Sequence, residues 1–494
     1  MRAAAGLDTN AEVQSHSSVA HWRFAQGDLN RMDYDMIVIG AGPAGYVCAI
    51  RASQLGQRVA IVEKEWLGGV CLNVGCIPSK SLLKNAEVAE LLRHGGKDFG
   101  FKLENLQLDF AAAVQRSRQI SRRLVKGVEF LLKKNKIEVL SGSAELTSAS
   151  AVKVTGADGS TRSVSAASIV VATGAHVFVP AAFKPDGKRV FTYLEAILQE
   201  SRPERVVIIG GGAIGVEFAT IWNAYGTHVT VVEKLPRLLP REDEEVSSEL
   251  AKAFKRQGIE VRNGATLENL DSSGPQVRVT ISTGAATETF EADQVMLAMG
   301  FAPNTKGLGL EALGVQLDRG FIQVDAGMRT NVPGVYAIGD VTGELLLAHV
   351  GSAQGIVCAE TIGAHPTVTL DYKMMPRATY CHPEVASFGH TEAEARTAGH
   401  ELKVARFNFQ ANGKALGLNE GSGWVKLITD AGTGEILGAH LIGPQVTELL
   451  PELTLAANAE LTIEEIARNV HAHPSLSEAL MEAAHGLAGG YIHA

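Results

Sequence analysis

The chain has 494 residues and a net charge of −9 at pH 7. Hydrophobic residues make up 46% of it and charged residues 20%, the balance of an ordinary globular protein long enough for about three domains. The acidic balance excludes a general electrostatic affinity for nucleic acid or an anionic membrane. No apolar run approaches the roughly 18–20 residues that cross a bilayer.

Residues 1–31 precede the first regular pattern. They lack the hydrophobic segment of a secretory signal, and Asp8, Glu12 and Asp28 do not suit a mitochondrial presequence, which is poor in acidic residues. We therefore expect a disordered extension, or an upstream start with Met32 as the natural first residue, on a cytoplasmic protein.

Residues 34–64 (YDMIVIGAGPAGYVCAIRASQLGQRVAIVEK) read as strand, glycine loop, helix and strand. In such a unit Gly40 makes the tight turn, Gly42 lets the backbone approach a pyrophosphate, and Gly45 lets the helix close on the strand. The pyrophosphate binds at the helix N-terminus. Glu63, at the end of the second strand, can accept hydrogen bonds from a ribose.

Cys71 and Cys76 follow this unit within GGVCLNVGCIPSK, and they are the only two of the five cysteines that are close in sequence. In a reducing compartment such a pair is mostly catalytic, and it lacks the second ligand pair of a zinc site. We expect Cys48, Cys358 and Cys381 to be small buried apolar residues. A dithiol beside a nucleotide loop indicates electron transfer between thiols and a flavin.

Further elements follow in chain order. Phe110–Lys134 has helical periodicity and many basic residues, which predicts an exposed helix. Ile169–Gly174 and Val295–Gly300 read as buried strands that end in small residues. Residues 330–340 (TNVPGVYAIGD) read as a strand that ends at Asp340, whose carboxylate suits a ribityl or ribose hydroxyl.

Residues 204–234 (ERVVIIGGGAIGVEFATIWNAYGTHVTVVEK) repeat the first unit in register, from the loop glycine Gly210 to the terminal acid Glu233. Two complete units predict two nucleotides: FAD at the first, next to the cysteines, and NAD at the second. Glu233 would repel a 2′-phosphate, so we expect NAD rather than NADP, although Lys234 and Arg237 lie close by in sequence.

The composition changes from about Tyr372, where the glycine fingerprints end. Strand patterns around Ala386, Val404–Phe409, Val425–Thr429 and Ile436–Ile442, followed by helices, predict a separate α+β domain.

These motifs, together with HAHPSLSE at residues 471–478, resemble the flavin disulfide reductases of the class I pyridine nucleotide-disulfide oxidoreductase family, from about Met32 to His485. Within that family, LNVGCIPSK and HAHPSLSE favour members that oxidise protein-bound dihydrolipoamide with NAD+, as the shared component of 2-oxo acid dehydrogenase complexes or the glycine cleavage system. The implied fold is α/β, with two Rossmann-like FAD/NAD(P)-binding domains and a C-terminal α+β dimerisation domain. The expected divisions are the extension 1–31, the FAD-binding domain with the redox disulfide 32–178, the NAD-binding domain 179–299, the second FAD-binding part 300–372 and the dimerisation domain 373–494.

The resemblance also implies residue roles. Cys71 is the interchange thiol that meets the lipoyl group and Cys76 passes electrons to the flavin, while His473 of the other subunit is the acid/base. The implied FAD contacts are Gly40, Gly42, Gly45, Glu63, Lys80, Ala144, Asp340 and Ala348. The implied NAD contacts are Gly210, Gly211, Gly212, Ala213, Ile214, Gly215, Glu233, Leu267, Ala298 and Gly300. Two positioning carboxylates complete the set, Glu217 beside Lys80 and Glu478 beside His473.

The chemistry suits these residue types. A thiolate is the nucleophile of disulfide exchange, and a histidine that titrates near neutrality can take a proton from dihydrolipoamide. A carboxylate on the other ring nitrogen fixes the tautomer, and Pro474 restricts the backbone of His473. The thiolate then attacks the Cys71–Cys76 disulfide, the electrons pass to FAD, and hydride passes to NAD+.

Two positions depart from the family pattern: Phe301 stands for an arginine and Val350 for a lysine. We interpret His471 as structural and His382 as lacking partners for a second site.

The alternatives are other flavin disulfide reductases or a non-catalytic FAD-binding assembly subunit. A glutathione reductase would need arginines in place of Glu233, and a mercuric reductase would need vicinal C-terminal cysteines. A soluble transhydrogenase would lack the dithiol. The assembly subunit would be favoured by loss of a redox cysteine or of His473, and all three are present.

Overall fold

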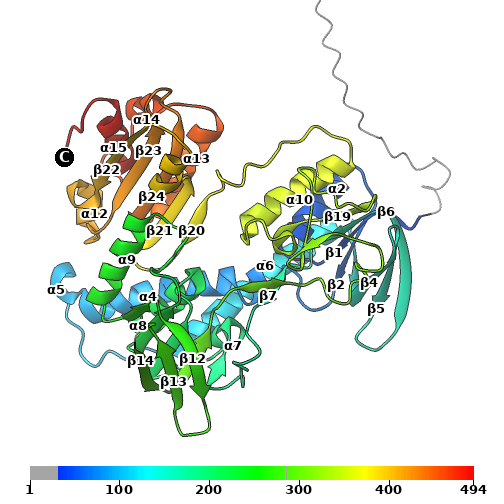
Figure 1. The fold of residues 1–494 in the computed structure, drawn as a ribbon, viewed down its shortest axis with the longest axis horizontal. Coiled ribbons are helices and arrows are strands. Elements are labelled where there is room, and N and C mark those ends of the chain that lie inside the picture. The colour runs from blue at the N-terminus through cyan, green and yellow to red at the C-terminus, as the bar shows by residue number, and fades with distance from the viewer. Residues whose placement is uncertain (1–31, 285, 494) are drawn as a thin grey trace, which may run out of the picture.

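The computed structural model describes residues 32–284 and 286–493, so the predicted disordered extension at 1–31 lies outside the described residues. The chain forms three lobes (Figure 1). The N-terminal elements, from β1 to β7, build most of the first lobe, and the chain then forms the second lobe. It returns to complete the first lobe and finally runs through an extended connection into the third lobe. None of the described helices is long and apolar enough to cross a membrane.

The first lobe is built on a seven-stranded sheet in the order β3-β2-β1-β6-β5-β4, with β19 paired to β6. Strands β1, β2, β3, β19 and the end of β6 run parallel, while β4 and β5 extend β6 as an antiparallel meander. The YDMIVI sequence of β1 is almost wholly buried, as expected of a central parallel strand covered on both faces. The elements before the second lobe are β1 (Tyr34–Ile39), α2 (Pro43–Gln54), β2 (Val59–Glu63), α3 (Gly69–Asn73), α4 (Cys76–His94), α5 (Gly96–Phe99), α6 (Phe110–Lys134), β3 (Glu138–Ser141), β4 (Ser143–Ser148), β5 (Ala151–Thr155), β6 (Thr161–Val171) and β7 (Ala175–Val177). Those after it are β16 (Phe301–Pro303), β17 (Leu317–Asp318), β18 (Phe321–Ile322), β19 (Val335–Ala337), η1 (Gly339–Thr342) and α10 (Ala348–Ile362).

The second lobe repeats the nucleotide-binding architecture. Its five-stranded parallel sheet has the order β11-β10-β9-β15-β8, and a three-stranded antiparallel sheet, β12-β13-β14, lies against it. The segment that leaves the first lobe, β7, pairs with the segment that returns to it, β16. The elements are β8 (Val190–Phe191), α7 (Tyr193–Ala196), β9 (Arg205–Ile209), α8 (Ala213–Ala224), β10 (His228–Glu233), α9 (Glu244–Arg256), β11 (Glu260–Asn263), β12 (Thr266–Asp271), β13 (Val277–Ser282), β14 (Thr287–Ala292) and β15 (Gln294–Leu297).

The third lobe is an antiparallel five-stranded sheet, β20-β21-β24-β23-β22, that shares an apolar core with helices α13, α14 and α15. The four strands predicted for this region are confirmed, and β21, β22, β23 and β24 correspond to them in order. The elements are β20 (Arg377–Thr379), β21 (Glu384–Gly389), α11 (Glu392–Thr397), β22 (Leu402–Asn408), η2 (Phe409–Ala411), α12 (Gly413–Gly417), β23 (Trp424–Asp430), β24 (Ile436–Gly443), α13 (Val446–Asn458), α14 (Ile463–Arg468) and α15 (Glu478–Ala488).

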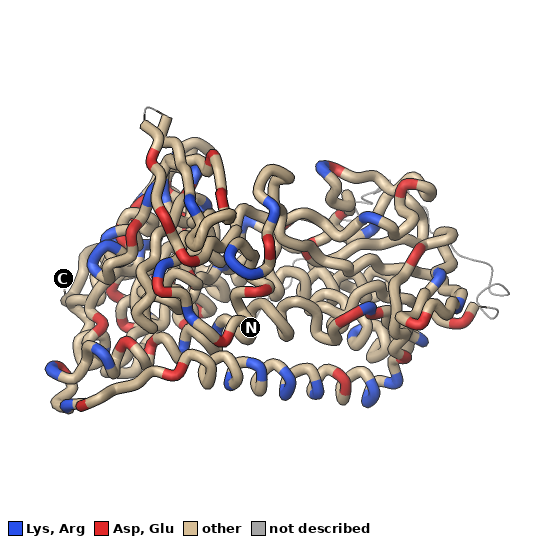
Figure 2. The backbone as a smooth tube through the Cα atoms, turned by 90° about the horizontal axis from the view of Figure 1, so that it is seen from below, with Lys and Arg blue, Asp and Glu red and all other residues tan. Residues whose placement is uncertain are grey.

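Helix α6 occupies the predicted residues, but only one of its faces is exposed. Ser117, Ser121, Val128 and Leu132 are buried, and the helix packs against α3 and α4. Its other face is a row of basic residues along the lower edge of the molecule in Figure 2. Helix α6 is therefore more than a solvent-exposed helix. Its buried face packs against the segment that carries the two cysteines.

Candidate active site

The first glycine loop has the geometry of a dinucleotide turn. Gly40 has φ +106°, and a side chain there would place Cβ 2.3 Å from the Ala172 carbonyl oxygen. A Cβ at Gly45 would lie 1.9 Å from the Gly40 carbonyl oxygen, so only glycine allows α2 to approach β1 this closely. Helix α2 begins after Gly42 without a side-chain cap. Its first-turn N–H groups are therefore free to bind a pyrophosphate.

Two carboxylates flank this loop. Glu63, at the end of β2, accepts hydrogen bonds from the backbone N–H of Ala41 and of Glu65, both at 2.8 Å. Asp340 lies in η1, and among the described residues its carboxylate has no hydrogen-bond or ion-pair partner. Burial raises the pKa of Asp340 from its ordinary value of 3.8 to about 6. An uncompensated carboxylate at this place fits a cofactor that supplies hydroxyl donors, as the ribityl chain of FAD does.

The raised pKa of Asp340 leads to a prediction about the apoprotein. Between about pH 4 and pH 6 the unfolded chain loses this proton while the folded chain keeps it, so stability falls as pH rises through that window. We expect Asp340→Asn apoprotein to melt a few degrees higher than wild type above pH 6, and at the same temperature at pH 3.5. The same variant should retain FAD less well on gel filtration. A constant difference in melting temperature across the pH range would contradict the assignment.

The remaining residues predicted to contact FAD lie in this lobe. Ala348 is the first residue of α10, the helix that packs along α2. Ala144 is buried in β4, in the antiparallel part of the same sheet.

The second glycine loop repeats the geometry of the first. Gly210 has φ +119°, and a Cβ at Gly215 would again lie 1.9 Å from the loop carbonyl, here that of Gly210. Glu233 accepts hydrogen bonds from the N–H of Gly211 at 2.6 Å and of Leu235 at 2.7 Å. The loop lies against the end of β15, because a Cβ on Gly210 would meet the Ala298 carbonyl oxygen at 2.2 Å.

Most residues predicted to contact NAD therefore gather at the carboxyl ends of the parallel strands of the second lobe. Gly212 and Ala213 begin α8, followed by Ile214, while Gly300 follows β15. Leu267 lies in β12 of the adjoining sheet. Ligands of open parallel sheets bind at this edge.

The two predicted redox cysteines are free thiols in contact with each other. Cys71 lies in α3 and Cys76 is the first residue of α4. The hydrogen bond from the Cys71 thiol and the charge of Lys80 lower the pKa of Cys76 against the effect of burial. The same hydrogen bond and burial raise the pKa of Cys71. The reduced pair therefore ionises first at Cys76, where the N-terminus of α4 also favours a negative charge.

Lys80 follows Cys76 by one turn of α4 and pairs with Glu217 of α8. Its Nζ lies 2.9 Å from each carboxylate oxygen of Glu217. Burial would lower the pKa of Lys80, but the Glu217 carboxylate outweighs it and holds that pKa above the ordinary value. Glu217 also accepts a hydrogen bond from the Tyr380 N–H at 2.9 Å, and Lys80 Nζ lies 4.7 Å from the Tyr380 ring centroid. The Lys80–Glu217 ion pair and its contacts with Tyr380 therefore connect all three lobes beside the dithiol.

Two tyrosines at this junction were not predicted from the sequence. Tyr380 contacts Lys80 as described, and Tyr193 is buried at the start of α7. Burial, followed by the charges of Asp340 and Cys76, raises the pKa of Tyr193 to about 12. Tyr193 therefore stays neutral near Cys76 and Asp340. Neither residue belongs to a sequence motif, so only the tertiary contacts identify them.

His473 and Glu478 form a pair at the start of α15. His473 Nδ1 lies 2.8 Å from Glu478 Oε1, and Glu478 Oε2 accepts the Ser475 N–H at 2.8 Å. Burial would raise the pKa of Glu478, but these two hydrogen bonds hold it below the ordinary value, so the carboxylate stays ionised. The His473 side chain is 79% exposed. It makes no hydrogen bond or ion pair with the dithiol of its own chain within the described residues.

Cys48, Cys358 and Cys381 are buried as expected. The buried His471 ring bonds Glu452 through Nε2 at 2.8 Å, which suits a structural role. Phe301, in place of the family arginine, lies on β16 with its ring centroid 6.4 Å from that of Tyr193. Val350, in place of the family lysine, is fully buried in α10.

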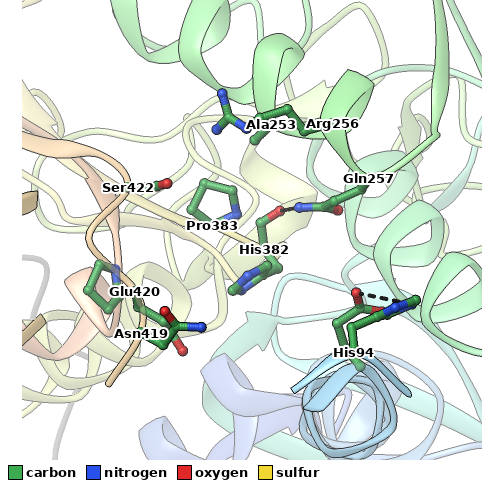
Figure 3. A pocket seen from close by; sticks show the side chains of 11 residues that line it. His94, Ala253, Arg256, Gln257, His382, Pro383, Asn419, Glu420 and Ser422 are labelled. Carbon is green, nitrogen blue, oxygen red and sulfur yellow. Dashed lines mark hydrogen bonds and ion pairs between the residues drawn. The ribbon is translucent and has the colours of Figure 1, made fainter. Parts of the chain in front are cut away.

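His382 lines a cavity of about 400 Å³ where the three lobes meet (Figure 3). His94 and Glu90 of α4 lie across it, 3.7 Å apart, and Glu420 lines the wall from the third lobe. Gln257 Nε2 donates to the His382 carbonyl oxygen at 2.9 Å. The described residues contain no group of three His, Cys, Asp or Glu side chains placed to hold a metal ion.

The comparison with known families agrees with this architecture. Residues 34–355 match the pyridine nucleotide-disulphide oxidoreductase family, and residues 375–484 match the dimerisation domain of the same family. The chain belongs to this family of FAD- and NAD-using flavin disulfide oxidoreductases, and it pairs with a second copy of itself. The predicted fold class, family and two cofactors are thereby confirmed.

Relatives within the family share most of the chain. A protein of Mycobacterium tuberculosis named dihydrolipoyl dehydrogenase is 50% identical over 463 residues, which is 93% of this chain and 99% of the relative. Proteins of the same name from Corynebacterium glutamicum and Chlorobaculum tepidum are 49% and 44% identical over 466 and 461 residues, covering 99% and 98% of their own lengths and 93% of this chain.

Two solved structures are similar throughout. LpdA from Mycobacterium tuberculosis gives a TM-score of 0.86 at 28% identity, covering 92% of this chain and 99% of that one. The HOCl-induced flavoprotein disulfide reductase RclA from Escherichia coli gives a TM-score of 0.81 at 28% identity, covering 91% and 99%.

Proposed function

We propose that this protein oxidises dihydrolipoyl groups to lipoyl groups with NAD+, the dihydrolipoyl dehydrogenase reaction. The observation that carries the proposal is the thiol pair of Cys71 in α3 and Cys76 at the start of α4. The pair lies beside Lys80 and Glu217, where the two nucleotide-binding lobes meet. The shared name of relatives at 44–50% identity over nearly the full chain supports the same substrate.

In this proposal the chain carries out thiol–disulfide exchange. His473 of the partner subunit takes a proton from one dihydrolipoyl thiol, and the thiolate attacks Cys71 of the oxidised pair. The Cys71–Cys76 bond breaks and Cys76 leaves as a thiolate, held by Lys80 and the helix N-terminus. The second lipoyl sulfur then displaces Cys71, which takes up the proton that this sulfur loses. The lipoyl disulfide closes, the enzyme pair is left reduced, and the first proton stays on the partner's His473.

FAD, when bound, would supply the two-electron redox chemistry that links the reduced pair to NAD+. Gly40, Gly42, Gly45, Glu63 and Asp340 would hold it in the first lobe. Gly210–Gly215 and Glu233 would hold NAD in the second. The chain's own part in this half-reaction is to orient both cofactors at the junction marked by Lys80, Glu217 and Tyr193.

A steady-state assay tests the proposal. Purified protein with free dihydrolipoamide and NAD+ should form NADH at a rate that saturates in both substrates. In the reverse direction NADH should reduce lipoamide but not glutathione disulfide or Hg²⁺. Turnover of glutathione disulfide, with no reaction of lipoamide, would replace the proposal with its nearest alternative.

We propose NAD rather than NADP because the Glu233 carboxylate stands at the loop where the adenosine ribose would lie. A 2′-phosphate there would face a fixed negative charge. We expect Glu233→Gln to lower the ratio of kcat/KM for NAD+ to that for NADP+ by about tenfold or more, which is on the order of 1.4 kcal/mol. Glu268→Gln, an exposed carboxylate of β12, is the matched control. An unchanged ratio would show that residues other than Glu233 determine the preference for NAD+ over NADP+.

The partners expected in the cell are protein-borne lipoyl groups. These are the lipoyl domains of 2-oxo acid dehydrogenase complexes or the lipoylated carrier of the glycine cleavage system. The proposed location is the cytoplasm, a reducing compartment in which the five thiols stay free and the dithiol cycles only through catalysis.

A further inference from the structure

The exposed side of α6 is the most positive feature of an otherwise acidic protein. Seven of its 25 residues are lysine or arginine and one, Glu129, is acidic, whereas the whole chain carries a net charge of −9. Arg122, Arg123, Lys126, Lys133 and Lys134 are exposed, and we call these five residues the α6 basic face. They form the row visible along α6 in Figure 2.

The α6 basic face is unpaired within its own subunit, in the part of the chain that the structure describes. Within residues 32–284 and 286–493 none of its five residues makes an ion pair or a side-chain hydrogen bond. Arg122 and Lys126 are four residues apart on the helix, a like-charge spacing that opposes helix formation. An exposed row of like charge on a rigid, packed helix is suited to meet a negatively charged surface.

Helix α6, which carries the basic face, adjoins the segment that carries the thiols. Helix α6 packs on α3, which carries Cys71, and on α4, which begins at Cys76. Arg118, one turn before Arg122, donates a hydrogen bond to the Asn73 carbonyl oxygen at the end of α3. A partner that rests on Arg122, Arg123 and Lys126 is therefore directed to the segment between the two cysteines.

Exposed apolar side chains accompany the charges. Leu124 and Leu131 are about two-fifths exposed, and Phe130 is 64% exposed. Apolar contact area within a charged rim is the usual composition of a protein interface, whereas a free small thiol substrate would need neither.

We propose that the α6 basic face is the docking surface for an acidic protein domain that carries the dihydrolipoyl group on its surface. This inference rests on the proposed function, because it assigns the place where the protein-borne form of that substrate is held. Charge complementarity speeds the encounter and sets the orientation, and the tethered group then reaches Cys71 from the end of α6 nearest to α3.

The test compares one enzyme on two substrates: free dihydrolipoamide and a recombinant, lipoylated and reduced lipoyl domain of net negative charge. The variant is Arg122→Glu/Lys126→Glu. The matched control is Lys184→Glu/Lys188→Glu in the loop before β8. It reverses two exposed lysines whose side chains have no ion-pair partner among the described residues, and it changes the net charge by the same amount. The neutral variant Arg122→Gln/Lys126→Gln guards against a folding defect.

For Arg122→Glu/Lys126→Glu we expect KM for the lipoyl domain to rise on the order of tenfold, with less than a twofold change in kcat/KM for free dihydrolipoamide. The glutamine variant should show an intermediate rise, and the loop control should show none. Added salt should lower wild-type kcat/KM for the domain and leave that for the free substrate unchanged.

Three results would overturn the docking surface: equal KM values for the domain in wild type and variant, a loop control that acts like the α6 variant, or loss of the homodimer in the α6 variant. The last would show that a second copy of this chain covers the face. Failure of wild-type enzyme to oxidise even free dihydrolipoamide would instead refute the proposed function.

Discussion

Replacing either cysteine of the pair with serine is expected to abolish dihydrolipoamide oxidation, with kcat falling by roughly 10⁴-fold or more, because neither thiol can form the exchangeable disulfide alone. The two variants should differ in one respect. Cys71→Ser keeps Cys76, whose pKa is lowered by a hydrogen bond that a serine hydroxyl at position 71 can still donate and by the charge of Lys80. Cys76→Ser keeps Cys71, which loses its interaction with the Cys76 thiolate but whose pKa burial still raises. Alkylation by iodoacetamide at pH 7 should therefore be faster for Cys71→Ser.

Cys381→Ser is the matched control for these variants. Cys381 is buried in the third lobe, and its Sγ donates to the Pro383 carbonyl oxygen at 3.3 Å, a bond that a serine hydroxyl can replace. We expect it to retain most of the activity. If Cys71→Ser or Cys76→Ser kept a tenth of wild-type kcat, electrons would have to pass from dihydrolipoamide to NAD+ without the Cys71–Cys76 disulfide, which would contradict the prediction.

Removing the imidazole of His473 is expected to have the second-largest effect. His473→Gln should lower kcat with dihydrolipoamide by about 10²–10⁴-fold, the usual contribution of a positioned general base. Glu478→Gln should cost less, on the order of tenfold, because it loses the ionised partner of Nδ1 but keeps a hydrogen-bond acceptor. NADH oxidation by an artificial acceptor such as ferricyanide should continue in both variants, since it bypasses the thiols.

The chain offers a matched control on the same helix. His493 Nδ1 bonds Glu482 Oε1 at 2.7 Å, one turn beyond the pair of Glu478 and His473. His493→Gln removes an equivalent imidazole outside the predicted site and should leave kcat within twofold of wild type.

Mixed dimers test whether His473 acts across the subunit boundary. Inactive Cys71→Ser and His473→Gln proteins, dissociated and reassociated together, should recover about a quarter of wild-type activity, since half the dimers would be mixed and each would hold one intact site. If His473 served the thiols of its own chain, every site in the mixture would lack one group and no activity would return.

Local sequence patterns predicted most of the fold. The two glycine units predicted the centre of both parallel sheets. A tight turn, a close helix–strand contact and a terminal acid all depend on residues within about 25 positions of one another. The predicted strands of the third lobe also match, since their alternation is local. For the same reason α6 was found at its full length, although its packing against α3 depends on contacts that no periodicity reveals.

The candidate site was predictable only in its local parts. The thiols and the pair of His473 and Glu478 lie within short motifs, and the structure brings each pair together. The placement of Tyr380 beside Lys80, and of Tyr193 near Cys76 and Asp340, depends on residues more than 100 positions apart, so only the assembled lobes reveal it. The cavity at His382 was missed for the same reason, because its walls come from three lobes.

The central claim is that a dithiol in this protein carries electrons from a dihydrolipoyl group toward NAD+. An anaerobic rapid-mixing experiment on the FAD-loaded protein tests it most directly. Dihydrolipoamide alone should produce a long-wavelength absorbance band from the Cys76 thiolate beside the flavin, and added NAD+ should remove the band and form NADH. A spectrum unaffected by dihydrolipoamide, in a protein whose flavin is still bleached by NADH, would contradict the account and show that the dithiol serves a different substrate.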